Sequence, residues 1–144
     1  MNFEQARTNM VLNQLRANRI KNSSLIEKIE LFPRENLYPK SYKHLAYSDK
    51  IIFLDDGRFI LPPLTSFHLL QSLGEIDDES ILEIGSGFGT STSIINKFSS
   101  NIDCIESSMQ MTEVFKNSIK DGLFNASLLD LSLIHISEPT RRRT

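Results

Sequence analysis

Apolar residues near the start of the chain recur at steps of three and four, the spacing of one face of an α-helix. One such face begins after Asn2 and a second after Ser23 or Ser24, polar residues that cap helix N-termini, and Pro33 ends the second. The inner positions of the two faces are Phe3, Ala6, Met10, Val11 and Leu15, and then Leu25, Ile26, Ile29 and Phe32. The pattern therefore predicts two amphipathic helices, followed by a short helix over residues 41–49.

The pattern changes between residues 50 and 74. The segment KIIFLDDGRFILPP contains two short apolar runs around Asp55-Asp56-Gly57, and Asp-Gly is typical of tight hairpin turns. Pro62 and Pro63 then open an apolar stretch that ends before Gly74, and proline suits the first turn of a helix as glycine suits its end. We expect a short hairpin followed by a third longer helix.

Strand and helix patterns alternate from Ser80 onward. The apolar runs 80–84 and 101–106 are each followed by a helical pattern, over 90–98 and 107–122. This alternation is typical of a parallel sheet in an α/β protein, and we expect the run 80–84 to be a buried strand. The predicted fold is α/β: a helical cap with a short hairpin (residues 1–75) precedes the start of a Rossmann-like core (residues 76–130).

Composition and charge narrow the class of protein. The chain has 144 residues, 40% of them hydrophobic and 24% charged, with a net charge of −2, which favours a globular domain and gives no basic field for nucleic acid. No apolar run approaches the ~20 residues of a membrane span, and the polar N-terminus does not resemble a signal peptide. We therefore expect a cytoplasmic protein that binds neither nucleic acid nor membrane. Cys104 is the one cysteine and is expected to be a small buried residue, and the three histidines show no metal-ligand spacing, so no metal site is expected.

A glycine-rich segment lies between the first core strand and its helix. Glu83, Gly85, Gly87 and Gly89 form the pattern E-x-G-x-G-x-G. Glycines at this place let a ligand approach the backbone, and ligands of α/β sheets bind at the carboxyl ends of the strands. A dinucleotide fingerprint would need glycine at position 90, which is Thr90, and there is no phosphate-binding G-x-x-x-x-G-K-[ST] motif. The pattern favours a nucleoside without a pyrophosphate, and a strand–helix turn without a ligand is the alternative.

Glu106 ends the second core strand, 21 residues after Gly85. An acid at this point can accept hydrogen bonds from both hydroxyls of a ribose. The alternative for Glu106 is a carboxylate that stabilises the start of a helix, and the alternative for Glu83 is an exposed strand end.

The glycine pattern with an acid after the second strand resembles the first two motifs of class I S-adenosylmethionine-dependent methyltransferases. The segments FEQARTNMVLNQLRANRI, LFPRENLYP, LAYSD, GRFILPP and ILEIGSGFG, in this order, are similar to the protein-L-isoaspartate O-methyltransferase family from about residue 3 to about residue 125. The resemblance implies a class I methyltransferase core and S-adenosyl-L-methionine as the cofactor. It implies these cofactor-binding residues: Glu83, Gly85, Ser86, Gly87, Gly89 and Glu106.

The family carries a Ser-x-Pro before the core, and its serine lies beside the transferred methyl group and the substrate carboxylate. Aligning GRFILPP with it places Leu61 at the serine and retains Pro63. A leucine has no hydroxyl to orient a carboxylate, so the catalytic residue stays unassigned. Arg58 precedes this stretch; a solvated turn residue is the expectation and contact with an anionic substrate the alternative.

The implied reaction transfers a methyl group from a sulfonium to a carboxylate of damaged, isoaspartyl-containing protein or peptide. A carboxylate needs no general base, so catalysis would consist of alignment and removal of water. One alternative is a methyltransferase with a different acceptor, with Leu61 marking the change. Another is a non-catalytic module that binds the cofactor or a partner protein. A complete protein of this kind is expected to be a monomer.

Residues 131–144 differ from the rest. Leu131–Arg141 match, residue by residue, the translation of a transposon-end sequencing adapter, so we expect the genuine sequence to end near Asp130 and the chain to be an N-terminal fragment. Such a fragment is expected to be poorly stable and to have little activity, with its second strand bordering unpaired edges.

Overall fold

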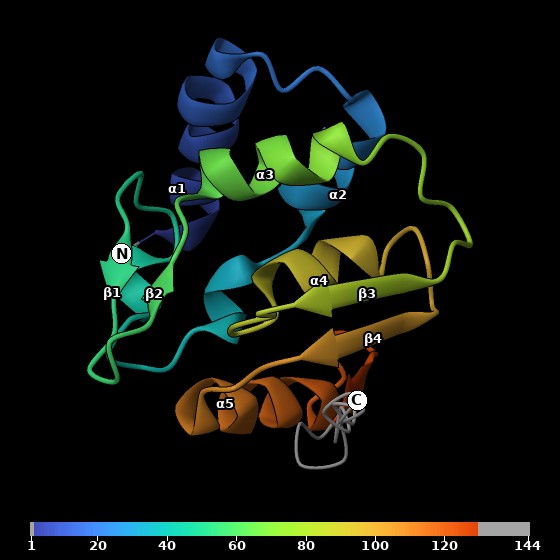
Figure 1. Ribbon diagram of the computed structural model, residues 1–144. Coiled ribbons are helices and arrows are strands. Elements are labelled where there is room, and N and C mark those ends of the chain that lie inside the picture. Colours follow the sequence, from blue (N-terminus) through green and yellow to red (C-terminus); the bar gives the residue numbers. More distant parts are fainter. Residues whose placement is uncertain (1, 130–144) are drawn as a thin grey trace, which may run out of the picture.

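The computed structural model describes residues 2–129 (Figure 1). Helix α1 (Phe3–Asn9) continues as a π-helical turn (Met10–Leu15) and a 3₁₀ turn (Arg16–Asn18), and α2 spans Ser23–Leu31. Two 3₁₀ turns follow, Arg34–Leu37 and Lys43–Leu45. The expected helices are confirmed, except that residues 41–49 form only the second of these short turns.

The capping residues explain where the first two helices begin. The side chain of Asn2 accepts a hydrogen bond from the backbone N–H of Gln5 at 3.0 Å, as expected. For α2 the expected cap was wrong: Asn22, not Ser23 or Ser24, accepts from the N–H of Leu25 at 2.9 Å. Asn22 has the extended backbone conformation that aims a cap's oxygen at the first turn, and the two serines already lie inside the helix.

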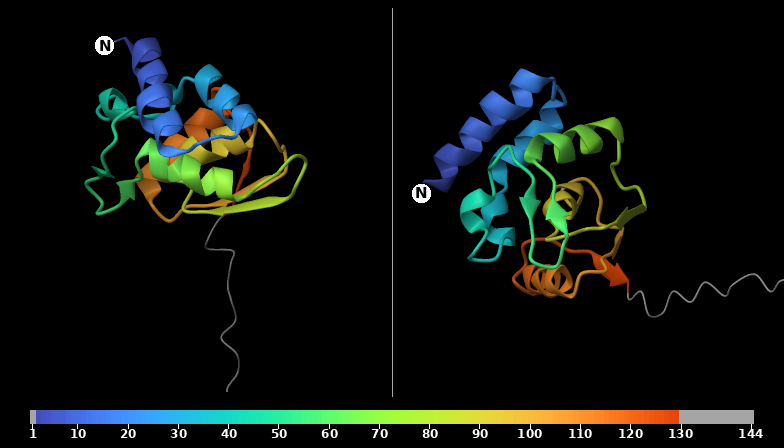
Figure 2. Two further views of the ribbon diagram at one scale, coloured as in Figure 1. Left: turned by 90° about the horizontal axis from the view of Figure 1, so that it is seen from above. Right: turned by 60° about the vertical axis from the view of Figure 1, so that its left-hand side comes forward.

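The hairpin and the next helix follow the prediction. Strands β1 (Ile52–Phe53) and β2 (Phe59–Ile60) pair antiparallel, and Gly57 takes a positive φ of 78° in the turn between them. Helix α3 (Pro63–Ser72) begins at a proline. The hairpin's turn reaches the start of the last helix, α5 (Met109–Lys120), as Figure 2 shows.

The core is a three-stranded parallel sheet in the order β3–β4–β5. Its elements are β3 (Ile81–Ile84), α4 (Thr90–Ile95), β4 (Ile102–Ile105), α5 and β5 (Ser127–Leu129). The sequence pattern did not reveal β5, because three residues are too few to show a period. Its presence corrects one expectation: β4 does not border an unpaired edge, since Ile105 pairs with Ile84 on one side and with Leu129 on the other.

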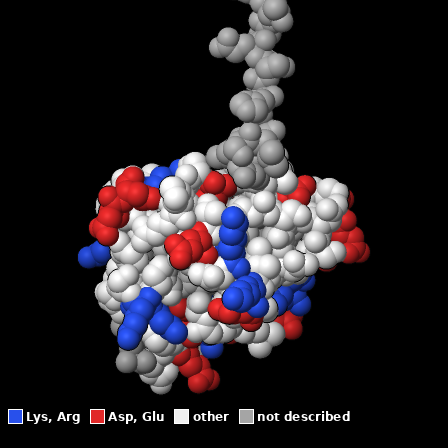
Figure 3. Space-filling model, turned by 90° about the horizontal axis from the view of Figure 1, so that it is seen from below, with Lys and Arg blue, Asp and Glu red and all other residues white. Residues whose placement is uncertain are grey.

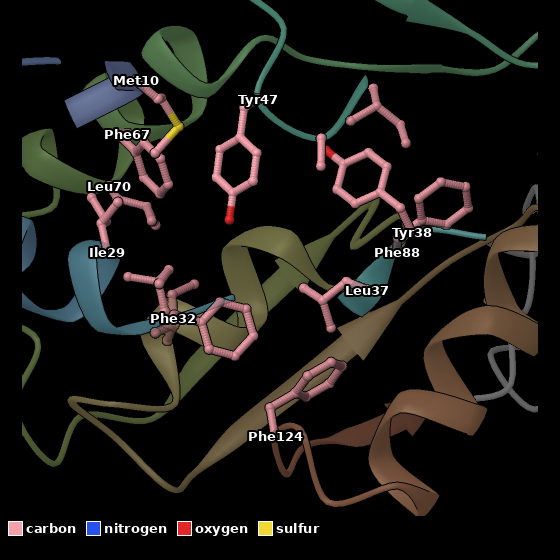
Figure 4. Packing of buried hydrophobic residues seen from close by; sticks show 14 of the residues in the cluster. Met10, Ile29, Phe32, Leu37, Tyr38, Tyr47, Phe67, Leu70, Phe88 and Phe124 are labelled. Atoms are coloured by element: carbon pink, nitrogen blue, oxygen red, sulfur yellow. The ribbon is translucent and has the colours of Figure 1, made fainter. Parts of the chain in front are cut away.

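One hydrophobic core joins the cap helices to the sheet. Met10, Ile29, Phe67 and Leu70 pack together in the cap, and Phe124 lies beside the sheet (Figure 4). All belong to a single cluster of buried side chains that also includes residues of α4. The prediction that β3 is a buried strand is wrong: Ile81 and Glu83 on its inner face are half-buried, and the side chains of Leu82 and Ile84 are 55% and 75% exposed on the other face.

The surface shows no large field of one charge on the face seen in Figure 3, where acidic and basic side chains are interspersed. Among residues 2–129, no helix has the length and apolarity needed to cross a bilayer. The same part of the chain contains no cluster of side chains that could hold a metal ion. The predicted tail, residues 131–144, lies outside the described residues.

Candidate functional site

The glycine loop (residues 85–89) connects β3 to α4 and lies against the end of β4. Gly85, Gly87 and Gly89 all have positive φ angles, of 80°, 59° and 84°, a conformation that other residues rarely adopt. The N–H of Gly85 donates to the carbonyl of Ile105 at 2.7 Å, so the loop is tied to the neighbouring strand. Three backbone positions therefore require the glycines that the sequence pattern singled out.

Glu106 follows β4 and lies directly beneath this loop. Its side chain is fully buried. Its Oε2 accepts a hydrogen bond from the N–H of Gly87 and its Oε1 one from the N–H of Ser108, both at 2.8 Å. Since Ser108 is the cap of α5, Glu106 also contacts the start of a helix, as its alternative interpretation proposed. The two predicted motifs thus meet through a single carboxylate.

Arg58, at the hairpin's turn, reaches the same carboxylate from 48 residues away in the chain. Its Nη2 lies 3.1 Å from Oε1 of Glu106, and its Nη1 donates to the hydroxyl of Ser107 at 3.0 Å. The expectation of a merely solvated turn residue was wrong, because the short hairpin brings Arg58 onto the loop between β4 and α5. No periodic pattern or motif in the sequence connects these residues.

Asp56 ties the hairpin to the same place. Its carboxylate accepts hydrogen bonds from the hydroxyl of Ser108 at 2.5 Å and from the backbone N–H of Arg58 at 3.0 Å. These hydrogen bonds, that of Ser108 first, lower the pKa of Asp56 below its ordinary value. The hairpin's turn is therefore attached to the β4–α5 loop at Ser107, Ser108 and Glu106.

Glu83 lies on the inner face of β3, toward α4. Its Oε2 accepts a hydrogen bond from the hydroxyl of Thr92 at 2.5 Å and lies 3.9 Å from the sulfur of Cys104. Burial raises the pKa of Glu83 to about 7. Its alternative interpretation as an exposed strand end does not match this position.

Cys104 is fully buried in the middle of β4, as expected for a small apolar residue. Burial, followed by the nearby charge of Glu83, raises the pKa of its thiol to about 12. The thiol is therefore neutral and unreactive at physiological pH.

A small cavity of about 90 Å³ lies beside the glycine loop. Its wall is formed partly by Leu61 and Phe59 after the hairpin's turn, and partly by Gly85, Ser86 and Gly87. The hydroxyl of Ser86 is buried there and has no hydrogen-bond partner among the described residues. Leu61, which the sequence alignment assigns to the family's serine, therefore shares a cavity with the loop residues.

A second cavity, of about 290 Å³, lies at the carboxyl ends of β4 and β5 and is also lined by Glu106. Its other lining residues are Ser107, Met109, Thr112, Lys116, Leu128 and Leu129. A third cavity, of about 210 Å³, lies between α2, α3 and α4, and none of its lining residues belongs to the glycine loop.

The donor set fits a nucleoside with a polar chain. A buried, unpaired hydroxyl lies at the loop, a buried carboxylate lies beneath it, and apolar walls lie on both sides. An added Cβ at Gly85 would be in ordinary van der Waals contact with Nη2 of Arg58, at 3.9 Å. The position of Arg58 conflicts with a ribose bound at Glu106, because the guanidinium occupies the side of the carboxylate that ribose hydroxyls would use.

Comparison with known proteins gives a consistent result. The sequence model of the family described as protein-L-isoaspartate (D-aspartate) O-methyltransferase matches residues 6–131. A protein-L-isoaspartate O-methyltransferase of Protochlamydia amoebophila is 27% identical over 116 residues, which cover 81% of this chain and 55% of the relative. A second such protein, from Anaeromyxobacter sp., is 32% identical over 92 residues, covering 64% of this chain and 38% of the relative.

A solved structure bearing the name protein-L-isoaspartate O-methyltransferase has the same fold. It superimposes with a TM-score of 0.67 at 21% identity, covering 85% of this chain and 41% of that one. This likeness confirms the predicted α/β, Rossmann-like methyltransferase fold. The chain spans about half the length of the relatives that it matches.

Proposed function

The chain belongs to the protein-L-isoaspartate (D-aspartate) O-methyltransferase family, and we propose that it binds S-adenosyl-L-methionine and serves methyl transfer to a carboxylate of isoaspartyl-containing protein. The observation that carries this proposal is the hydrogen bond from Gly87 N–H to Glu106, 2.8 Å long. It joins the glycine loop and the acid after the second strand into one site, as a nucleoside with an attached amino acid requires.

Each part of the cofactor has residues suited to it. The loop residues Gly85, Ser86, Gly87 and Gly89 would hold the methionine part, with the unpaired hydroxyl of Ser86 as a hydrogen-bond donor. Glu106 would accept from the ribose hydroxyls. The cavity at Met109 and Leu128 offers apolar surface to adenine. Glu83, held by the hydroxyl of Thr92, lines the small cavity beside the loop and would face the cofactor there.

The cofactor supplies an electrophilic methyl group that a carboxylate can accept directly. The chain's own task is then to align the acceptor and to exclude water from it. Leu61, Phe59 and Phe88 give the small cavity apolar walls beside the loop, and these walls would exclude water. Leu61 cannot align the acceptor, because it has no group that hydrogen-bonds to a carboxylate.

A different acceptor is the second candidate, and the position of Leu61 favours it. The cavity that Leu61 lines has an apolar wall at the point where the family places a hydroxyl. Such a wall suits an acceptor that presents apolar surface next to its reacting atom. A non-catalytic module that binds only the cofactor or a partner remains the third candidate.

Transfer of a tritium-labelled methyl group to an isoaspartyl peptide, with its aspartyl counterpart as control, tests these candidates. Replacing Leu61 by serine restores one hydroxyl and should raise transfer to the isoaspartyl peptide about tenfold, the worth of one such hydrogen bond. Leu61→Val is the matched control and should not. Because the chain spans about half the length of its relatives, the same assay belongs in a chimera that joins residues 1–129 to the second half of the Protochlamydia relative. Equal rates for the serine and valine variants would contradict the role given to position 61.

Three further parts of this proposal stay predictions. The boundary between a cap (residues 1–75) and a core (residues 76–130) crosses one continuous hydrophobic cluster, so the two parts are expected to unfold together. A cytoplasmic location and a monomeric state of the complete protein follow from the family and are open to cell fractionation and light scattering.

A further inference from the structure

The carboxylate of Glu106 has all its acceptor positions in use. A carboxylate offers about four positions for donors, two on each oxygen. The N–H groups of Gly87 and Ser108 take one position on each oxygen. Nη2 of Arg58 lies 3.1 Å from Oε1 and 3.4 Å from Oε2, and so faces the two that remain. A ribose held by Glu106, as the proposed function requires, must use the positions that Arg58 now uses.

The guanidinium of Arg58 can take a second position, beside the glycine loop, when a ligand displaces it from Glu106. Its backbone is fixed, because Asp56 accepts its N–H and the hairpin is tied to Ser108. Its side chain is 40% exposed and lies along the glycine loop, with Nη2 3.9 Å from the position of a Cβ at Gly85. Rotation of the guanidinium alone therefore moves it from Glu106 to the loop, where the amino-acid part of the ligand would lie.

We propose that Arg58 is a specificity-determining residue that makes binding depend on the ligand's carboxylate. The ribose hydroxyls replace the guanidinium at Glu106, and the guanidinium then pairs with the carboxylate of the attached amino acid beside Gly85. A nucleoside that lacks the carboxylate breaks the pair between Arg58 and Glu106 without giving Arg58 a new partner. The site thereby discriminates against nucleosides without an anionic chain. This inference rests on the proposed function, because it takes Glu106 as the ribose ligand.

Two probes that differ in one group test this proposal. S-adenosylhomocysteine carries the carboxylate, and 5′-methylthioadenosine has the same nucleoside and sulfur without it. Dissociation constants for both are measured by calorimetry on the 144-residue chain, on Arg58→Met and on Arg16→Met. Arg16 is the matched control, because it forms an exposed ion pair with Glu30 in the cap, with its Nη2 3.4 Å from the carboxylate.

The account predicts opposite changes for the two probes. In Arg58→Met, methylthioadenosine should bind about tenfold more tightly and S-adenosylhomocysteine about tenfold more weakly, since each change involves one charge-assisted hydrogen bond. Arg16→Met should match the unaltered chain for both, and Arg58→Lys should keep most of the preference. Added salt should strengthen methylthioadenosine binding to the unaltered chain, because it screens the ion pair that the ligand must break.

An Arg58→Met variant that weakens both probes equally, or leaves their ratio unchanged, would overturn the proposal while leaving the cofactor site in place. Failure of the unaltered chain and all three variants to bind either probe would overturn the proposed function, and this inference with it. Circular dichroism of each variant shows that the compared proteins are folded.

Discussion

Two glutamates, Glu83 and Glu106, lie at the ends of neighbouring parallel strands, and their carboxylates have different partners. Glu83, in β3, has a buried carboxyl group, is held by the hydroxyl of Thr92 and lies close to the thiol of Cys104. Glu106, after β4, is held by two backbone N–H groups and the guanidinium of Arg58. The first therefore has a pKa raised to about 7, whereas the second is the charged partner of an ion pair. The partners, and not the strand position, decide what each carboxylate can do.

The two carboxylates face different cavities. Glu83 braces the strand from which the glycine loop begins, through Thr92, and lines the small cavity beside the loop. Glu106 contacts the loop itself and also reaches the start of α5 and the hairpin. A ligand at the loop would therefore meet Glu83 in the small cavity and Glu106 in the cavity at the ends of β4 and β5.

The largest expected effect comes from the glycine loop, which connects β3 to α4 and contacts Glu106. A methyl group at Gly89 would lie 2.5 Å from the ring of Phe124, and the residue has a φ of 84°. Gly89→Ala should therefore lower the free energy of unfolding by about 3–5 kcal/mol, through overpacking and backbone strain together. Urea denaturation measures it.

Gly74→Ala is the matched control, because Gly74 has a similar φ of 78° but open space around it. Gly74→Ala should lower the free energy of unfolding by about 1 kcal/mol, which is the cost of the backbone strain alone. Equal losses for the two variants would show that contact with Phe124 does not matter.

The next effect separates the two acids. Glu106→Ala leaves the N–H groups of Gly87 and Ser108 without their partner and should lower the free energy of unfolding by about 2–3 kcal/mol. Hydrogen exchange should also show faster exchange at these two amides, and unchanged exchange at Thr92, which lies at the other acid. A uniform increase across the whole chain would contradict this local role.

Replacing Glu83 should raise the free energy of unfolding, whereas replacing Glu106 lowers it, and the gain should grow as the pH rises. The folded protein binds the Glu83 proton more tightly than the unfolded chain does, so the free energy of unfolding falls as the pH rises from about 4.5, its ordinary pKa, to about 7. Glu83→Gln removes this fall. The variant should be more stable than the unaltered chain by about 3 kcal/mol at pH 8, and equal to it at pH 4. Urea denaturation at both pH values gives the comparison, and the same difference at pH 4 and pH 8 would contradict the buried, uncompensated carboxyl.

The smallest effect is expected one residue further along β3. Ile84 points away from Glu83 and is 75% exposed. Ile84→Thr should change the stability of the 144-residue chain by less than about 0.5 kcal/mol. The same substitution at Ile102, a buried residue of β4, should cost about 2–3 kcal/mol by loss of buried carbon and burial of a hydroxyl. Similar losses at both positions in thermal denaturation would show that the outer face of β3 is covered.

Local patterns predicted the parts of the site that depend on local chemistry. The spacing of Glu83, Gly85, Gly87 and Gly89 located the loop, because only glycine takes these backbone angles readily. Glu106 was predicted because acids after the second strand of such sheets occupy one recurrent place. The role of Leu61 rests on alignment with the family and stays a prediction, and the structure shows that Leu61 shares a cavity with the loop.

What the sequence did not predict depends on contacts between distant segments. Arg58 reaches Glu106 because the hairpin formed by β1 and β2, each two residues long, places its turn against the β4–α5 loop. Strand β5 is too short to show an apolar period, and the exposure of Leu82 and Ile84 depends on which face of the sheet receives helices. The cap of α2 was misassigned by one residue because Asn22, Ser23 and Ser24 are all good capping residues, and the backbone angle decides among them.

The most direct test is an amide-resolved NMR titration of the chain with S-adenosylhomocysteine. The account predicts that the largest shifts occur at Gly85, Gly87 and Gly89 in the loop and at Ser107 and Ser108 next to Glu106, and that Glu106→Ala abolishes them. No shifts at millimolar ligand, or the largest shifts around the third cavity, at Asn22 and Glu75, would contradict a cofactor site at the glycine loop.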